Sequence, residues 1–373
     1  MTTLPPPASL PAFALLGQEV PLPTVEKALQ QLFEPASDGE KGQAGGIARA
    51  SLINLALYNE NPGELESDAI VLAELTNETA CRSLLIHAEP NAPEPGVRSW
   101  VQAHCQIGKN GKKTVCTEQI SFILMGNSPG LLRNVVLAHL DSDLPLAFWW
   151  RGELSDAFEE RLYSRIDRLL YDSEKWAVPR NQFLRLLECQ RNSSSAFVMH
   201  DLAFTRLNGI RHAIANAFDR PAVCRELSSL SEVEIRYADG YRLSGLYLAA
   251  WVASRLGAEI DVAQSTPDTV VCLPNRKGAR TGFQIRIAAL SPERRGTVEI
   301  DLQLGATRVE VSRCQTRDFI RTLINRPGSA TEEDWLPARR MHDASLVADI
   351  LNRAGRNRTH LEVLPGVLTL LAL

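Results

Sequence analysis

The sequence predicts an α/β fold, in which a mixed sheet with βαβ units and a hairpin is followed by a smaller α+β domain. Between residues 48 and 256, short apolar runs alternate with longer segments of helical periodicity, which is typical of α/β proteins. After residue 265, four short strands with tight turns replace this alternation. The chain has 373 residues, more than a single hydrophobic core usually holds, so we expect two folded domains.

The expected domain boundaries follow these changes in pattern. Residues 1–22 are rich in proline and predict an extended arm, and a short helix is expected at 24–33. The chain is therefore divided into an N-terminal arm with a short helix (1–46), an α/β domain (47–262) and a C-terminal α+β domain (263–373).

The first pair of strands is predicted to be parallel. Residues 51–58 form an apolar run of strand character, Pro62 opens a helix that extends to residue 76, and residues 83–87 form a second apolar run. A strand, a helix and a strand at this spacing make a βαβ unit. Its crossover connection brings the two strands together in parallel.

Two long strands joined by a tight turn come next. Residues 97–107 and 112–125 flank Asn110-Gly111, the residue pair that two-residue hairpin turns prefer. This turn sets a register in which Ile107 faces Thr114, Cys105 faces Cys116, Ala103 faces Glu118 and Val101 faces Ile120. The apolar residues then share one face of the hairpin, and a slip of one residue would destroy this sorting.

The facing pair Cys105 and Cys116 has two interpretations. Directly opposed residues in a hairpin have Cα atoms within the range that a disulfide spans, so the pair could form a redox-sensitive bridge. Free cysteines also pack well on an apolar face, and in a reducing compartment we expect this second state. Glu118, on the same face, is interpreted as the partner of an arginine, as a residue at the sheet edge, or as a functional carboxylate.

The remaining elements alternate in the same way as far as Gly257, which ends an apolar helix. Helices are expected at 129–140, 155–163, 175–190, 208–218 and 242–256, and strands at 144–150, 166–171 and 232–237. The C-terminal domain is expected to contain strands at 270–273, 282–290, 297–304 and 308–313, a loop at 326–340, a helix at 344–354 and an apolar tail.

Composition and charge exclude several classes of function. The formal net charge is -4 at pH 7 and 45% of the residues are apolar, so no overall charge favours nucleic acid or a membrane surface as a partner. The N-terminus lacks the features of a secretion signal, and no apolar stretch is long enough for a membrane span. The 7 cysteines are scattered without zinc spacing, so we expect a cytoplasmic protein without a metal site.

The familiar catalytic and cofactor-binding motifs are absent from the sequence. It contains no Gly-x-Ser-x-Gly elbow, no Walker A loop, no Gly-x-Gly-x-x-Gly fingerprint and no His-Glu-x-x-His motif. We therefore expect no catalytic residue of these types and no cofactor. An alternative stays open: a sugar-phosphate-binding sensor or enzyme that holds its anion in a clamp of Arg161, Arg165, Arg168 or Arg206.

Three motifs in the block 143–219 carry the strongest functional signal. They are Asp143-Leu-Pro-Leu-Ala-Phe-Trp149-Trp150, then Ser164-Arg-Ile-Asp167-Arg-Leu-Leu-Tyr-Asp172-Ser, and then His200-Asp201-Leu-Ala-Phe204-Thr-Arg206. Their order and spacing resemble the glucose-6-phosphate dehydrogenase assembly protein family, OpcA. Cys81-Arg82 and Glu118-Gln-Ile120 are also similar to the family pattern, and the resemblance covers most of the chain from residue 48.

The resemblance implies an assembly factor or allosteric activator in carbohydrate metabolism. Members of that family bind glucose-6-phosphate dehydrogenase, promote its oligomerisation or activity in the oxidative pentose phosphate pathway, and are not themselves enzymes. Some relatives respond to thioredoxin through cysteines. The resemblance thus implies the dehydrogenase as the partner and thioredoxin as a further partner. The pair that faces across the hairpin, Cys105 and Cys116, supplies the redox candidates.

Contacts with a partner are expected in the same motifs. Adjacent tryptophans on a strand point to opposite faces, so one indole enters the core and the other needs a second packing layer or a partner. The candidate contact residues are Trp149, Trp150, Arg165, Asp167, Asp201 and Arg206. Each also has a structural explanation: core packing for the tryptophans, a helix or turn cap for Asp201, and ion pairing of Arg206 with Asp201 or Asp167.

Overall fold

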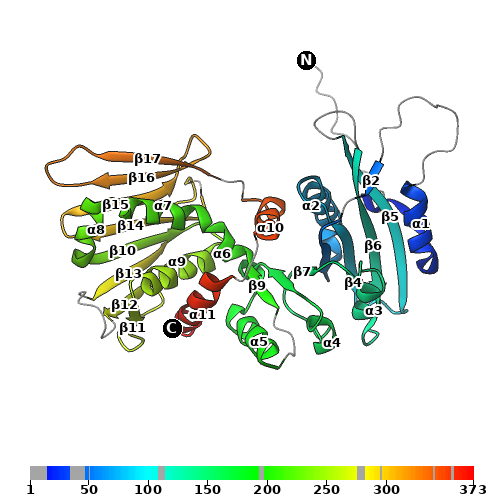
Figure 1. The fold of residues 1–373 in the computed structure, drawn as a ribbon. Coiled ribbons are helices and arrows are strands. Elements are labelled where there is room, and N and C mark those ends of the chain that lie inside the picture. The colour runs from blue at the N-terminus through cyan, green and yellow to red at the C-terminus, as the bar shows by residue number, and fades with distance from the viewer. Residues whose placement is uncertain are drawn as a thin grey trace, which may run out of the picture. The chain divides into compact units, whose positions relative to one another are not determined.

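The computed structural model confirms the α/β class. It describes residues 15–33, 47–49, 51–107, 114–192, 197–274, 282–294, 296–338, 341–353 and 357–373. Two large mixed sheets with helices make up the fold, and the chain divides into two compact units (Figure 1). Unit 1 comprises Met1–Tyr171, Glu188–Met199 and Val347–Ala354, and unit 2 comprises Asp172–Leu187, His200–Leu346 and Gly355–Leu373.

Unit 1 is built on a sheet with the strand order β1-β5-β6-β4-β3-β7-β8-β9, and β2 pairs with β6. The strands are β1 (Gln18–Val20), β2 (Ile47–Arg49), β3 (Asn54–Asn59), β4 (Arg82–Glu89), β5 (Gly96–Ile107), β6 (Thr114–Met125), β7 (Leu146–Trp150), β8 (Arg168–Tyr171) and β9 (Val198–Asp201). Neighbouring strands from β6 to β8 run parallel, whereas β5 is antiparallel to β6. The expected βαβ unit is confirmed, because β3 and β4 pair in parallel.

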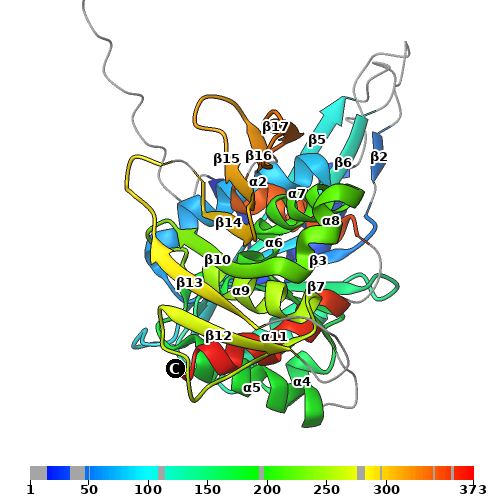
Figure 2. The same cartoon turned by 90° about the vertical axis from the view of Figure 1, so that its left-hand side faces the viewer.

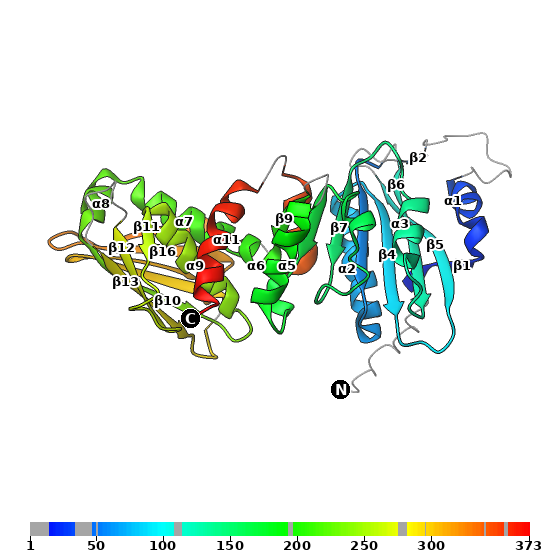
Figure 3. The same cartoon turned by 90° about the horizontal axis from the view of Figure 1, so that it is seen from below.

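Helices cover this sheet. They are α1 (Val25–Phe33), α2 (Leu65–Glu78), α3 (Leu131–Ala138) and α4 (Glu160–Tyr163), and α5 (Pro179–Asn192) spans the boundary between the units. Helix α1 contacts β5, and α2 contacts β3, β4 and β5 (Figure 3). Leu65, Ala69 and Leu72 recur at helical spacing and are buried, so one face of α2 packs on the sheet.

The predicted hairpin register is confirmed. Cys105 pairs with Cys116 and Ala103 with Glu118, as the sequence predicts, although the Asn110-Gly111 turn lies outside the described residues. Cys105 and Cys116 form a disulfide with their Cα atoms 4.1 Å apart, instead of the expected free thiols, because direct opposition brings the two side chains together. Glu118 is buried beside Arg82, whose Nη1 lies 3.0 Å from Glu118 Oε1, so the arginine partner is the interpretation that holds.

Unit 2 contains a sheet with the strand order β11-β12-β13-β10-β14-β15-β16-β17 (Figure 2). The strands are β10 (Leu230–Tyr237), β11 (Ala258–Ile260), β12 (Thr269–Pro274), β13 (Phe283–Ala289), β14 (Val298–Leu304), β15 (Thr307–Arg313), β16 (Phe319–Asn325) and β17 (Glu332–Pro337). Strand β10 is parallel to β13, and the other neighbours in this sheet are antiparallel. The helices are α6 (Leu202–Arg206), α7 (Asn208–Phe218), α8 (Pro221–Glu226), α9 (Arg242–Arg255) and α11 (Arg358–Leu370), and α10 (Asp343–Leu351) spans the unit boundary.

The two faces of the unit 2 sheet differ in character. Val233, Ile235 and Ile285 alternate with polar residues and are buried, on the face that α7 and α9 cover. The opposite face carries ion pairs between neighbouring strands, among them Arg286 with Glu232 at 2.5 Å. This alternation is the pattern expected of a sheet with one buried face.

The boundaries between the two compact units do not coincide with the domain boundary expected after residue 262. The sequence assigns β10 and α9 to the α/β domain, but β10 lies in the middle of the unit 2 sheet and α9 packs on β10 and β13. The loop expected at 326–340 contains β17, and the expected apolar tail contains α11. A local pattern indicates a strand or helix but not the sheet with which it pairs, which explains these corrections.

Candidate functional site

Asp172 of the second motif and Asp201 and Arg206 of the third motif lie together in unit 2. Asp201 ends β9 and caps α6, because its Oδ1 accepts hydrogen bonds from the N–H groups of Ala203 at 2.9 Å and Ser173 at 3.2 Å. The Tyr247 hydroxyl lies 2.8 Å from Asp201 Oδ2 and 2.9 Å from His360 Nε2. Asp201, Tyr247 and His360 are buried. The cap interpretation of Asp201 is confirmed.

Burial shifts the protonation of this network. Burial raises the pKa of Asp201 to about 7, and the neighbouring charge of Asp172 adds to the effect. Burial also lowers the pKa of His360 to about 3, with further contributions from His200 and Arg211. His360 is therefore a neutral hydrogen-bond partner of Tyr247 near pH 7, where the Asp201 carboxyl is partly protonated.

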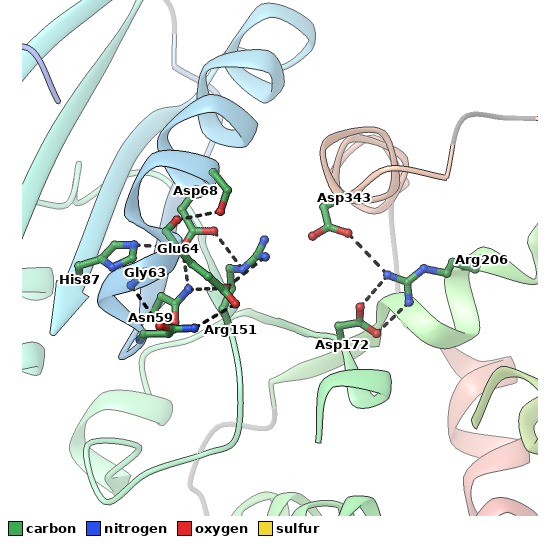
Figure 4. Close-up of polar contacts among 11 residues, drawn as sticks. Asn59, Gly63, Glu64, Asp68, His87, Arg151, Asp172, Arg206 and Asp343 are labelled. Atoms are coloured by element: carbon green, nitrogen blue, oxygen red, sulfur yellow. Dashed lines mark hydrogen bonds and ion pairs between the residues drawn. The ribbon is translucent and has the colours of Figure 1, made fainter. Parts of the chain in front are cut away.

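Arg206 forms a bidentate ion pair within the same unit. Its Nη1 and Nη2 donate to the two carboxylate oxygens of Asp172 at 2.8 Å and 2.6 Å, and Nη2 lies 3.6 Å from Asp343 Oδ1 (Figure 4). Burial opposes the charge of Arg206, but the hydrogen bonds to Asp172 raise its pKa above the ordinary value. The predicted pairing with Asp201 or Asp167 is wrong, because Asp172 and Asp343 are the partners. We call Asp172, Asp201, Arg206, Tyr247 and His360 the motif cluster.

Both tryptophans of the first motif lie in the core. Trp149 is 1% exposed and Trp150 is 0% exposed, and β7 lies between β3 and β8 inside the sheet. The Trp150 indole packs on Tyr58, with ring centroids 4.4 Å apart, and its Nε1 donates to the Glu153 carbonyl at 2.9 Å. A covered strand in the middle of a sheet buries both of its faces, so core packing explains both side chains.

The other candidate residues near β8 lie closer to solvent. Arg161, Arg165 and Asp167 are exposed, and Asp167 Oδ2 accepts a hydrogen bond from the Leu146 N–H at 2.8 Å. Arg168 Nη1 lies 3.3 Å from the carbonyl oxygen of Ile350 and 3.2 Å from that of Leu351. Two of the four arginines of the proposed anion clamp, Arg168 and Arg206, are therefore engaged by the protein itself.

A second polar cluster, which the sequence analysis does not identify, lies in unit 1 at the carboxyl ends of β3, β4 and β7 (Figure 4). We call Asn59, Glu64, Asp68, His87 and Arg151 the strand-end cluster. Asp68 Oδ2 accepts from Asn59 Nδ2 at 2.7 Å and lies 3.0 Å from His87 Nε2. Arg151 Nε lies 3.1 Å from Asp68 Oδ1, and Arg151 Nη2 lies 3.6 Å from Glu64 Oε2.

Asp68 is the centre of the strand-end cluster. Asp68, Asn59 and His87 are buried, and a buried carboxylate is stable only when it is paired and hydrogen-bonded. One local signal for this cluster exists in the sequence: Glu64 and Asp68 are four residues apart at the start of the helix that follows β3. The contributions of His87 and Arg151 depend on the pairing of β3 with β4 and β7.

The surface of unit 2 carries an aromatic corner at β16 and β17. The chain has 6 tryptophans, of which Trp335 is 42% exposed and the other five are buried. Phe319, which is 36% exposed, packs edge to face on Trp335, with the two ring centroids 6.3 Å apart. The Arg321 guanidinium lies 5.8 Å from the Trp335 ring centroid, and its Nε donates to Glu333 at 2.5 Å. We call Phe319, Arg321 and Trp335 the aromatic corner.

The described ranges contain neither a metal-binding cluster nor a membrane-spanning helix. Within them, no group of three or more histidine, cysteine, aspartate or glutamate residues is placed to hold a metal ion. No helix in the same ranges is both long and apolar enough to cross a membrane.

Two domain models of one family match the chain in sequence order. The model of the glucose-6-phosphate dehydrogenase subunit N-terminal domain matches residues 73–188, and that of the C-terminal domain matches residues 198–364. The OxPP cycle protein OpcA of Nostoc punctiforme is 27% identical over 236 residues, which are 62% of this chain and 47% of that protein. The OpcA protein of Synechococcus elongatus is 23% identical over 194 residues, 51% of this chain and 42% of that protein. The chain thus spans about half the length of these curated relatives.

Solved structures resemble the chain in general fold alone. An oxidoreductase from Sinorhizobium meliloti aligns over 85% of this chain and 86% of its own, with 9% identity and a TM-score of 0.42. The transcriptional regulator Gal80p from Kluyveromyces lactis aligns over 84% of this chain and 82% of its own, with 9% identity and a TM-score of 0.43.

Proposed function

We propose that this chain, which belongs to the OpcA family of glucose-6-phosphate dehydrogenase subunits, binds that dehydrogenase and promotes its oligomerisation or activity without catalysing a reaction itself. The observation that carries the proposal is the match of both domain models, in chain order, to residues 73–188 and 198–364. The proposed setting is the oxidative pentose phosphate pathway in the cytoplasm.

The geometry of the motif cluster favours a role without catalysis. A catalytic acid or base must come within hydrogen-bond reach of its substrate, but Asp201, Tyr247 and His360 are buried and bonded to one another. Arg206 likewise holds Asp172 with both Nη atoms. A satisfied buried network fixes the elements that carry it, so these residues support a rigid binding scaffold.

An assembly factor of this kind acts through differential affinity. It can shift the dehydrogenase toward an active or oligomeric state only by binding that state more tightly than the inactive one. The dehydrogenase must then also bind this chain more tightly in its active state. Binding and kinetics therefore have to change together if the proposal is correct.

Two exposed groups are the proposed contact surfaces. The aromatic corner of unit 2 combines Trp335, Phe319 and Arg321, and tryptophan and arginine are enriched among the residues that dominate binding energy. Arg165 and Asp167 remain candidates in unit 1 because their side chains are exposed. Trp149 and Trp150 are instead proposed to support the fold, since both are buried.

A binding and rate assay with the purified cognate dehydrogenase tests the proposal. We expect a complex in size-exclusion chromatography, and a raised maximal rate or a lowered substrate requirement of the dehydrogenase when this chain is added. The chain alone should give no turnover with glucose 6-phosphate and either nicotinamide dinucleotide. The proposal is rejected if the dehydrogenase neither binds the chain nor changes its kinetics.

A further inference from the structure

The unit 1 sheet has the strand order of a dinucleotide-binding fold. Its parallel strands lie in the order β6-β4-β3-β7-β8. From β3 the chain therefore adds β4 and β6 on one side and then returns to add β7 and β8 on the other. In open α/β sheets, ligands bind outside the carboxyl ends of the strands where this order reverses. Here the reversal lies between β3 and β7, so the fold implies a dinucleotide site at the end of β3.

The turn after β3 lacks the backbone that a pyrophosphate needs. Dinucleotide-binding folds use several glycines between the first strand and helix, so that the chain can turn tightly and approach the phosphates. The corresponding segment here reads Asn59-Glu-Asn-Pro-Gly-Glu64 and contains one glycine, Gly63. A side chain at Gly63 would be crowded, because its Cβ would lie 3.3 Å from Asn61 Oδ1. Asn61 Oδ1 also accepts a hydrogen bond from the Gly63 N–H at 3.1 Å, so a side chain of the protein already uses this N–H group.

The charges at the same place oppose an anion. Helix N-termini bind phosphate through free N–H groups and the positive end of the helix dipole, but Glu64 and Asp68 bring two carboxylates to the start of α2. Arg151 is the cation of the strand-end cluster, and it lies beside both carboxylates, 3.1 Å from Asp68 Oδ1 and 3.6 Å from Glu64 Oε2. A pyrophosphate would have to displace these pairs and would meet a buried carboxylate.

We infer that the cofactor position implied by the fold of unit 1 is filled by the strand-end cluster, so that this chain binds no nicotinamide dinucleotide. Asp68 takes the place of an external anion: it joins Asn59 at the end of β3, His87 on β4 and Arg151 after β7. The cluster thereby ties α2 to three strands. Other proteins of this topology bind a cofactor at this position. Here the strand-end cluster instead connects α2 to the sheet.

A direct titration of the chain, without any dehydrogenase, tests the absence of the site. NADPH and NADH fluorescence should show no saturable change up to about 1 mM cofactor, a limit that corresponds to a binding free energy of about -4 kcal/mol. A dehydrogenase of known affinity serves as the positive control for the measurement. Saturable binding of either dinucleotide to the chain below that limit overturns the inference.

The structural role of the strand-end cluster is tested by replacing its central carboxylate, Asp68. Asp68→Asn removes the charge that pairs with Arg151, so the melting temperature should fall by roughly 6 °C or more. Glu66→Gln is the matched control, because Glu66 is exposed on the same turn of α2 and its replacement should leave the melting temperature unchanged. If Asp68→Asn fails to fold while Glu66→Gln folds, this also supports the structural role of the cluster. An Asp68→Asn protein as stable as the control overturns it.

Discussion

Replacing Tyr247 with phenylalanine tests the buried network of unit 2 directly. The Tyr247 hydroxyl lies 2.8 Å from Asp201 Oδ2 and 2.9 Å from His360 Nε2, so its removal takes one partner from each of two buried groups. A buried polar group that loses its partner costs about 1–3 kcal/mol. For two such groups, the free energy of unfolding should therefore fall by about 2–6 kcal/mol. Phenylalanine keeps the aromatic ring, whose centroid lies 5.2 Å from that of Phe204, so the packing of the ring is retained.

This loss should depend on pH because Asp201 titrates near neutrality in the folded protein. Its pKa of about 7 lies above the ordinary value of 3.8, so between these values the folded state binds more protons than the unfolded state. The contribution of Asp201 to stability is therefore present at low pH and is lost as the pH rises through about 7. Tyr247 donates to the ionised carboxylate, so its hydroxyl contributes more at high pH. His360, with a pKa of about 3, is neutral in this range.

Urea unfolding followed by tryptophan fluorescence, at about pH 5 and about pH 8, measures both effects. Tyr247→Phe should lose more stability at the higher pH. Tyr237→Phe is the matched control, because Tyr237 at the end of β10 is partly exposed, and its loss should be small at both pH values. Equal losses at the two pH values, or a loss no larger than that of the control, would refute the reasoning.

Three further predictions concern the ion pair, the aromatic corner and the disulfide. Asp172→Asn leaves the buried Arg206 without its bidentate partner, so urea unfolding should show a loss of about 3–5 kcal/mol; a loss below about 1 kcal/mol would contradict this. Trp335→Ala should weaken dehydrogenase binding about 10-fold or more by calorimetry without lowering the melting temperature. Leu52→Ala, an exposed apolar residue of unit 1, should change neither quantity, and unchanged affinity of Trp335→Ala would reject the corner as a contact. The double variant Cys105→Ser/Cys116→Ser should have the same melting temperature as the wild type treated with dithiothreitol. Both should be about 2–3 kcal/mol less stable than the oxidised protein. A wild type whose melting temperature does not change with this reductant, or with thioredoxin, would rule out a redox role for the pair.

Much of unit 1 could be predicted because its signals are local. The Asn110-Gly111 pair and the alternation around it set one hairpin register, and the structure has that register from Val101 to Ile107. The strand-helix-strand spacing after residue 51 likewise predicts parallel pairing of β3 with β4. In both cases a few neighbouring residues contain the whole rule, since turn geometry and crossover handedness depend on local sequence.

The candidate site could be predicted only in part. Asp201 as a helix cap follows from its position just before a helix. Its bond to Tyr247 does not, because that residue is 46 positions away, and Tyr247 meets His360 across another 113 positions. The partner of Arg206 could not be predicted for the same reason: several acidic residues lie nearby in sequence, and only the packing of the elements selects Asp172.

The sequence by itself determined the α/β class, the hairpin register and the family of this protein, because each depends on patterns that neighbouring residues carry. The tertiary structure alone decided that Trp149 and Trp150 are both buried and that Trp335 is exposed. It also decided that β10 joins the C-terminal strands in one sheet. An apolar strand has the same pattern whether its second face meets a helix or a partner, and only the neighbours brought in by distant segments settle which of the two it is.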